Sequence, residues 1–256
     1  MTHHRIDVED LRFSYPDGTK ALQGVSLAVS HGESIALVGA NGAGKSTLLQ
    51  HLVGLHHPQT GTVEIGEVPV TNETLADVRK SVGMVFQDPD DQLFMPTVAE
   101  DVAFGPLNLG LPAEVVEERV TVALTTVGAL ALRDRPPYRL SGGEKRAVAI
   151  ATVLAMNPSV LVMDEPSSNL DPKARRRLIG LLATFRHTKL IATHDLELAL
   201  ELCERTVVMR EGRVAADGPT REVFADAELL DACGLEQPAS MLPCSACGAA
   251  AGIIGA

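Results

Sequence analysis

The stretch that decides the fold is Gly39-Ala40-Asn41-Gly42-Ala43-Gly44-Lys45-Ser46-Thr47. It fits the pattern G-x-x-x-x-G-K-[ST], in which backbone N–H groups of a glycine-rich loop point at phosphate oxygens. The apolar run Ser34-Ile35-Ala36-Leu37-Val38 precedes it and predicts a buried strand, and a helix is predicted over residues 45–53. A chance glycine-rich turn would not require both flanks, so we predict a loop that binds nucleotide phosphates.

The side chains of this loop have separate predicted roles. Lys45 brings a positive charge to the β- and γ-phosphates, and Ser46 offers a hydroxyl to Mg²⁺. The positive N-terminal end of the following helix adds to the attraction for phosphate. The residues expected to contact the nucleotide here are Gly39, Asn41, Gly42, Gly44, Lys45, Ser46 and Thr47.

Outward from the loop, apolar runs of strand length alternate with segments of helical spacing. Strands that alternate with helices predict an α/β fold with a mainly parallel sheet covered by helices on both faces. Alternating apolar and polar residues over 6–27, and the pattern of a strand pair over 61–70, predict a further antiparallel part. The strands predicted for the parallel sheet are residues 34–38, 82–86, 160–163 and 189–193.

The composition changes twice along the chain. Between Pro112 and Val127 apolar residues recur at helical spacing, and residues 88–157 are predicted to form a mostly helical subdomain inserted in the α/β core. We expect one domain over residues 1–236. The segment 237–256 is rich in Ala, Gly, Ser and Cys, and we expect it to be flexible and poorly ordered.

Charge and composition narrow the functional classes. The formal net charge is −11, so long-range attraction does not favour nucleic acid, and no nucleic-acid partner is expected. No apolar run approaches the roughly 18 residues that a membrane-spanning helix needs, and the N-terminus lacks the apolar region of a secretory signal. The four cysteines are too few and too clustered for a disulfide framework. We expect a cytoplasmic chain that reaches a membrane only through a partner.

Three of the predicted strands end in residues suited to metal binding and hydrolysis. Ligands of an open parallel sheet bind at the carboxyl ends of its strands. There Asp164 is expected to hold Mg²⁺, and Glu165 to orient or deprotonate the attacking water. His194 is a candidate for contact with the γ-phosphate or the water, although a histidine at a strand end also serves as a cap or packing residue. Gln87 is a candidate for contact with Mg²⁺ or the water, on weaker grounds because it is a single glutamine.

The stretch Leu140-Ser141-Gly142-Gly143-Glu144-Lys145-Arg146 resembles the signature L-S-G-G-Q of the ABC family, with Glu144 where Gln is commonest. Tyr15 lies where these proteins keep an aromatic residue that stacks on adenine. The resemblance covers residues 6 to about 225 and implies a P-loop NTPase of the RecA-like type that hydrolyses ATP with Mg²⁺. The motifs that follow the family's order are the phosphate loop, Gln87, the signature, Asp164-Glu165, Asp171 and His194.

The signature also implies a second subunit. Ser141-Gly142-Gly143 precedes an apolar helix predicted over residues 147–156, so small residues stand at a helix N-terminus that favours anions. In ABC proteins this terminus faces the γ-phosphate held by the opposite subunit, and Asp171 would lie across the dimer seam. The resemblance therefore implies a partner ATPase subunit, either an identical chain or a sister chain.

Residues 86–94 and 97–105 resemble the ATPases of energy-coupling-factor importers, and most of all those of cobalt/nickel uptake. That resemblance implies a transmembrane coupling protein docked near residues 92–104, a substrate-capture membrane protein, and a place on the cytoplasmic face of the cell membrane. Phe94 and Phe104 are candidates for the docking groove, with burial in the core as the alternative. A soluble ABC ATPase acting on nucleic acid or ribosomes, and an exporter ATPase, remain alternatives.

Overall fold

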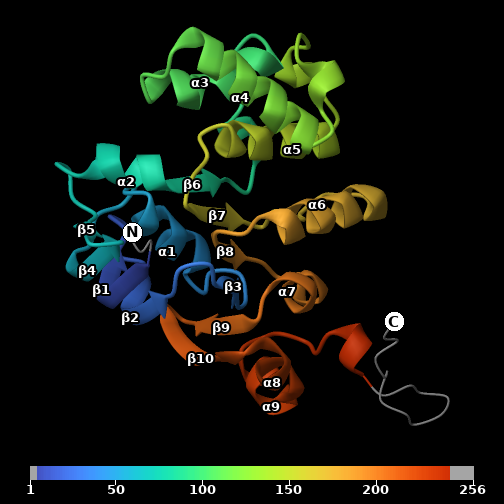
Figure 1. The fold of residues 1–256 in the computed structure, drawn as a ribbon. Coiled ribbons are helices and arrows are strands. Elements are labelled where there is room, and N and C mark those ends of the chain that lie inside the picture. The colour runs from blue at the N-terminus through green and yellow to red at the C-terminus, as the bar shows by residue number, and fades with distance from the viewer. Residues whose placement is uncertain (1–4, 243–256) are drawn as a thin grey trace.

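The computed structural model describes residues 5–242, which form two sheets and a separate layer of helices (Figure 1). The larger sheet has the strand order β10-β9-β3-β8-β7-β6, parallel except for β10. The smaller sheet has the order β2-β1-β4-β5 and is antiparallel. The predicted fold class, an α/β core with an antiparallel part and a helical part, is confirmed.

The strand bounds match the apolar runs closely in the parallel sheet. Its strands are β3 (Ser34–Val38), β6 (Val82–Val85), β7 (Val160–Asp164), β8 (Thr188–Ala192), β9 (Arg205–Arg210) and β10 (Arg213–Pro219). The strands of the antiparallel sheet are β1 (Ile6–Ser14), β2 (Lys20–Val29), β4 (Thr60–Ile65) and β5 (Val68–Pro69).

Both faces of the sheet are buried along its parallel strands, whereas the antiparallel edge strand β10 has only exposed and half-buried residues. Along β3, Ile35 and Leu37 point into a core shared with the antiparallel sheet and helix α1 (Lys45–Leu52). The alternate residues Ala36 and Val38 point into a second core, formed with helices on the opposite face. Because neither face meets water, these strands are apolar at nearly every position instead of alternating. The helices of the second core are α6 (Pro172–Thr184), α7 (Leu196–Leu202), α8 (Thr220–Ala225) and α9 (Ala227–Ala232), together with one side of α5 (Gly142–Leu154).

The range predicted as a helical insertion contains three α-helices with a core of their own. They are α3 (Val98–Asn108), α4 (Ala113–Thr126) and α5 (Gly142–Leu154), and Figure 1 shows them as a layer beyond β6 and β7. Helix α5 begins five residues before the expected residue 147, at Gly142. The reason is local, because Ser141 and Glu144 form a reciprocal capping box that starts the helix.

Several short elements were not predicted. Helix α2 (Leu75–Ser81), like α8 and α9, is only six or seven residues long, too short to show a clear apolar period. Residues 237–242, expected to be poorly ordered, instead pack on the core: Gln237 donates hydrogen bonds to the carbonyls of Phe224 and Ala225, at 3.0 and 3.2 Å. The rest of that segment, with Cys244 and Cys247, lies outside the described residues. Within residues 5–242 no helix is long and apolar enough to cross a membrane.

Candidate active site

The phosphate loop connects β3 to α1, and its first and last glycines are required by packing. Gly39 has φ +150°, and a Cβ atom there would lie 2.2 Å from the carbonyl oxygen of Met209. Gly44 has φ +102°, and a Cβ atom there would lie 2.5 Å from the carbonyl oxygen of Ala21. Only glycine combines these dihedrals with such close backbone approach. The close packing of the loop against neighbouring backbone therefore requires glycine at both positions of the motif, 39 and 44.

Lys45 lies inside the curve of this loop. Its ammonium group donates hydrogen bonds to the carbonyl oxygens of Gly39 and Ala40, at 2.7 and 3.2 Å. Burial lowers the pKa of Lys45, while the nearby carboxylates of Glu165 and Asp164 oppose that change. The loop thus holds a buried cation next to Asp164, which ends β7, and Glu165, which follows it.

Asp164 is the buried acid at the end of β7, and one of its carboxylate oxygens, Oδ1, has no hydrogen-bond partner. Burial raises the pKa of Asp164, against the opposing effect of a hydrogen bond with the Ser46 side chain. A buried carboxylate oxygen beside a hydroxyl is a donor set that Mg²⁺ accepts, and a bound cation would favour the ionised acid. Asp164 and Ser46 therefore fit a magnesium site.

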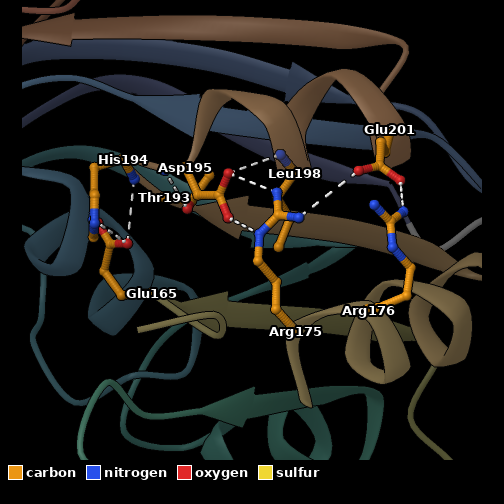
Figure 2. Close-up of polar contacts among 8 residues, drawn as sticks. All are labelled: Glu165, Arg175, Arg176, Thr193, His194, Asp195, Leu198 and Glu201. Atoms are coloured by element: carbon orange, nitrogen blue, oxygen red, sulfur yellow. Dashed lines mark hydrogen bonds and ion pairs between the residues drawn. The ribbon is translucent and has the colours of Figure 1, made fainter. Parts of the chain in front are cut away.

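Glu165 and His194 come from neighbouring strands and meet at the same edge of the sheet (Figure 2). The Glu165 carboxylate accepts a hydrogen bond from the His194 backbone N–H at 3.2 Å and lies 2.8 Å from the ring Nδ1. Glu165 is buried and has φ +46°, the left-handed region that a glutamate rarely adopts. Such backbone strain, about 1 kcal/mol or more, is found most often at functional sites. The pair joins a buried acid to an exposed imidazole.

Gln87 follows β6 at the same edge, and its side chain is exposed. Among the described residues this side chain makes no hydrogen bond to Asp164 or Ser46. Its backbone is fixed instead: the buried guanidinium of Arg146 on α5 donates to the carbonyls of Phe86 and Gln87, at 2.7 and 2.6 Å. The sequence motifs assign no role to Arg146, and its place directly before the apolar run 147–151 is the one signal that its side chain could be buried and paired.

Tyr15 lies beside the start of α1. Its hydroxyl is 3.0 Å from the Oγ1 atom of Thr47, the last residue of the phosphate loop. Its half-buried ring packs edge-on against Phe13, with 5.2 Å between the ring centroids. This is a suitable place for a ring that contacts the base of a nucleotide whose phosphates are in the loop.

The remaining predicted residues form a second group. Ser141 is the N-cap of α5 and Asp171 is the N-cap of α6. Ser141, Gly142, Gly143 and Asp171 all line one cavity, of about 610 Å³. Among residues 5–242 no hydrogen bond or ion pair joins this group to the phosphate loop. The predicted residues of one chain therefore lie in two separate groups, the phosphate loop with its neighbouring acids and the signature with Asp171.

Known proteins are similar to this chain in sequence. The family described as ABC transporter matches residues 22–168. An ABC transporter ATP-binding protein of Geobacter sulfurreducens is 63% identical over 248 residues, covering 97% of this chain and 100% of its own length. The energy-coupling factor transporter ATP-binding protein EcfA of Methanothermobacter thermautotrophicus is 48% identical over 238 residues, covering 91% of this chain and 76% of its own.

A solved structure agrees in fold as well as in sequence. It is that of cbiO1 from Clostridium perfringens, described as part of the ABC transporter complex cbiONQ, with a TM-score of 0.78 and 40% identity over 90% of this chain and 94% of that chain. The resemblance stated from the motifs is confirmed by these relatives. The chain therefore belongs to the ABC transporter family, as an ATP-binding subunit that hydrolyses ATP.

Proposed function

We propose that two copies of this chain enclose two ATP molecules, each held by the phosphate loop of one copy and the signature of the other. Each chain carries both halves of such a site, and the two halves lie on separate surfaces. Because ATP contacts both copies only while its γ-phosphate is attached, hydrolysis removes the contact that favours the closed pair.

The observation that carries this proposal is the glycine pair of the signature. A Cβ atom at Gly142 would meet nothing within 4 Å, and one at Gly143 would be 3.6 Å from Ala174 Cβ, an ordinary contact. Both residues have helical backbones and lie in the first turn of α5, where glycine destabilises a helix by up to about 1 kcal/mol relative to alanine. The folded chain does not need these glycines for packing, so a ligand that approaches from outside is their best explanation.

A Gly142→Ala variant should therefore separate stability from activity. The free energy of unfolding should stay the same or rise by up to about 1 kcal/mol, because alanine favours the helix. ATP hydrolysis should fall about tenfold or more because the added methyl group obstructs the approach of phosphate. Urea denaturation and a steady-state ATPase assay measure the two effects. Gly180→Ala, on α6 and also with nothing within 4 Å of the new Cβ, is the control and should keep its activity.

Within each site, the residues of the phosphate loop side have distinct proposed tasks. Lys45 binds the β- and γ-phosphates, and Ser46 and Asp164 hold Mg²⁺, which when bound neutralises charge on those phosphates. Glu165 orients or deprotonates the water, and His194 keeps that carboxylate in place and contacts the γ-phosphate. Gln87 is proposed to transmit the presence or absence of the γ-phosphate to α5, because Arg146 on that helix is hydrogen-bonded to the Gln87 carbonyl.

We further propose that the ATPase energises an importer of the energy-coupling-factor type, for cobalt/nickel or a related micronutrient, from the cytoplasmic face of the cell membrane. The similarity to EcfA and to cbiO1 supports this class. So does an exposed apolar patch on the helical layer: Phe94, Phe104 and Leu107 are 62%, 42% and 56% exposed. Phe94 and Phe104 pack edge-on, with 5.0 Å between the ring centroids. Because both rings are exposed, the alternative of burial in the core does not occur.

Asp101 holds the backbone at Phe94 in place. Its buried carboxylate accepts hydrogen bonds from the backbone N–H groups of Phe94 and Met95, both at 3.0 Å. An exposed aromatic pair whose backbone is held by a buried carboxylate is suited to receive an apolar helix of a transmembrane coupling protein. A separate membrane protein would capture the substrate.

A Phe94→Ser, Phe104→Ser double variant should lose its membrane partner. Co-purification from detergent-solubilised membranes should drop by about tenfold or more, because exposed aromatic residues supply much of the binding energy of such interfaces. Val122→Ser is the matched control, since Val122 is 58% exposed on α4 outside the patch. Unchanged capture of membrane proteins by the double variant, or capture of ribosomes in place of membrane proteins by the wild type, would contradict the importer proposal.

A further inference from the structure

Contacts between α6 and α7 extend the pair formed by Glu165 and His194 (Figure 2). Asp195, the next residue, is the N-cap of α7, and its carboxylate accepts a hydrogen bond from the backbone N–H of Leu198 at 3.0 Å. The same carboxylate accepts two hydrogen bonds from the guanidinium of Arg175 on α6, from Nε at 2.6 Å and from Nη2 at 2.9 Å. Arg175 thus fixes the residue that directly follows His194.

The Arg175–Asp195 contact has the geometry of a strong pair. Two parallel N–H···O bonds hold a planar carboxylate in one orientation, which a single contact cannot do. The side chains are 24% and 19% exposed, so solvent screens the pair only in part. Burial by itself would raise the pKa of Asp195, but the hydrogen bonds from Arg175 and Leu198 bring it below its ordinary value. The carboxylate is therefore ionised at neutral pH, as this pairing requires.

Arg175 also belongs to the first turn after Asp171. Its backbone N–H donates to the Asp171 carbonyl at 2.9 Å, and the Asp171 side chain caps the same turn. In the proposed ATP sandwich Asp171 faces the second copy. Asp171, at the subunit boundary, is therefore one helical turn from Arg175, which is linked to His194 through Asp195.

We propose that Arg175 is a positioning residue for hydrolysis: through Asp195 it holds His194 against Glu165, and it ties that geometry to the start of α6 at the subunit boundary. The proposal rests on the shared ATP site proposed above. Arg175 itself does not touch the reacting atoms. Its effect is on the placement of the imidazole, and a small misplacement of a catalytic group is enough to slow a reaction substantially.

The neighbouring Arg176 supplies a matched control. It lies on the same helix and also bonds to α7, through Glu201, but its side chain is 66% exposed and is not bonded to Asp195 (Figure 2). If Arg175 only joined two helices, then loss of either arginine would have a similar effect on hydrolysis. If Arg175 acts through His194, then only its own loss slows hydrolysis.

The test compares steady-state ATPase kinetics of the full-length chain and its variants. Arg175→Ala should lower kcat about tenfold with KM for ATP changed less than about twofold, and Arg176→Ala should stay within about twofold of the wild type in both. Arg175→Lys, which keeps the charge but not the bidentate fork, should recover part of the loss. In a His194→Ala background, Arg175→Ala should cause no further loss. A full tenfold loss in that background would overturn the proposal.

A second readout does not depend on turnover. The imidazole resonances of His194 in NMR spectra should shift in Arg175→Ala and should be unchanged in Arg176→Ala. Unchanged His194 resonances in Arg175→Ala would overturn the positioning role. A wild-type chain that binds ATP but never hydrolyses it would instead count against the proposed function, and the resonances would still decide the role of Arg175.

Discussion

Replacing Glu165 with glutamine is expected to reduce ATP hydrolysis by at least about a hundredfold while ATP binding persists. The amide has the same shape as the carboxylate but cannot take a proton from the attacking water. The phosphate loop and the Glu165 backbone hydrogen bond to Ala192, at 2.8 Å, do not depend on the side-chain charge. Because the closed pair opens only after hydrolysis, the variant should also accumulate as an ATP-bound dimer.

Two measurements on this variant are decisive together. Light scattering in the presence of ATP should give the mass of a dimer, and the ATPase assay should give almost no phosphate. Glu197→Gln, the same substitution on α7 at a residue that bonds Ser240, is the control and should hydrolyse normally. A monomer in ATP, or hydrolysis at the wild-type rate, would show that Glu165 does not have the role assigned to it.

Ser141→Arg is expected to have an effect of similar size from the other half of the site. Its own phosphate loop is untouched, so ATP should bind with nearly the same affinity, but hydrolysis should fall about a hundredfold. The new side chain fills the space in front of the first turn of α5. It also removes the cap of the helix. In that cap the Ser141 hydroxyl accepts a hydrogen bond from the Glu144 backbone N–H and donates one to the Glu144 carboxylate.

A second variant separates the effect of losing the helix cap from the effect of the bulky arginine side chain on hydrolysis. Ser141→Ala loses the same capping box, at a cost of about 1 kcal/mol in stability, but leaves the space open. We expect Ser141→Ala to lose stability as Ser141→Arg does and to retain more hydrolysis. Equal activities of the two variants would show that the cap, and not the approach of a ligand, is what hydrolysis needs.

The fold could be predicted where local sequence and tertiary environment agree. Ser34–Val38 was predicted with the observed bounds, because a strand buried on both faces is apolar throughout and the glycines beside it end it. The start of α5 was misplaced because Gly142 and Gly143 are poor helix formers, and the capping box outweighs them. Short helices such as α2 contain too few turns to show a period.

Some features of the candidate site could be predicted from the sequence, and others could not. The shared position of Asp164, Glu165 and His194 could be predicted because they follow two predicted strands, and parallel strands end at one edge of a sheet. The partners of Arg146 and Arg175 could not be found in this way. Their long side chains reach contacts 59 or 60 and 20 positions away in sequence, set by how helices pack on the sheet. The positions of residues at strand ends were therefore predictable, and the contacts of residues that connect distant elements were not.

The most direct test of shared sites is to mix two inactive variants, Ser141→Arg and Lys45→Ala. In a mixed dimer the intact phosphate loop of the first variant faces the intact signature of the second, so one of the two sites is complete. Neither variant alone should hydrolyse ATP, and an equal mixture should recover up to about a quarter of the wild-type rate, since half of randomly formed dimers are mixed. A mixture as inactive as its components would contradict the sharing of each ATP between two chains.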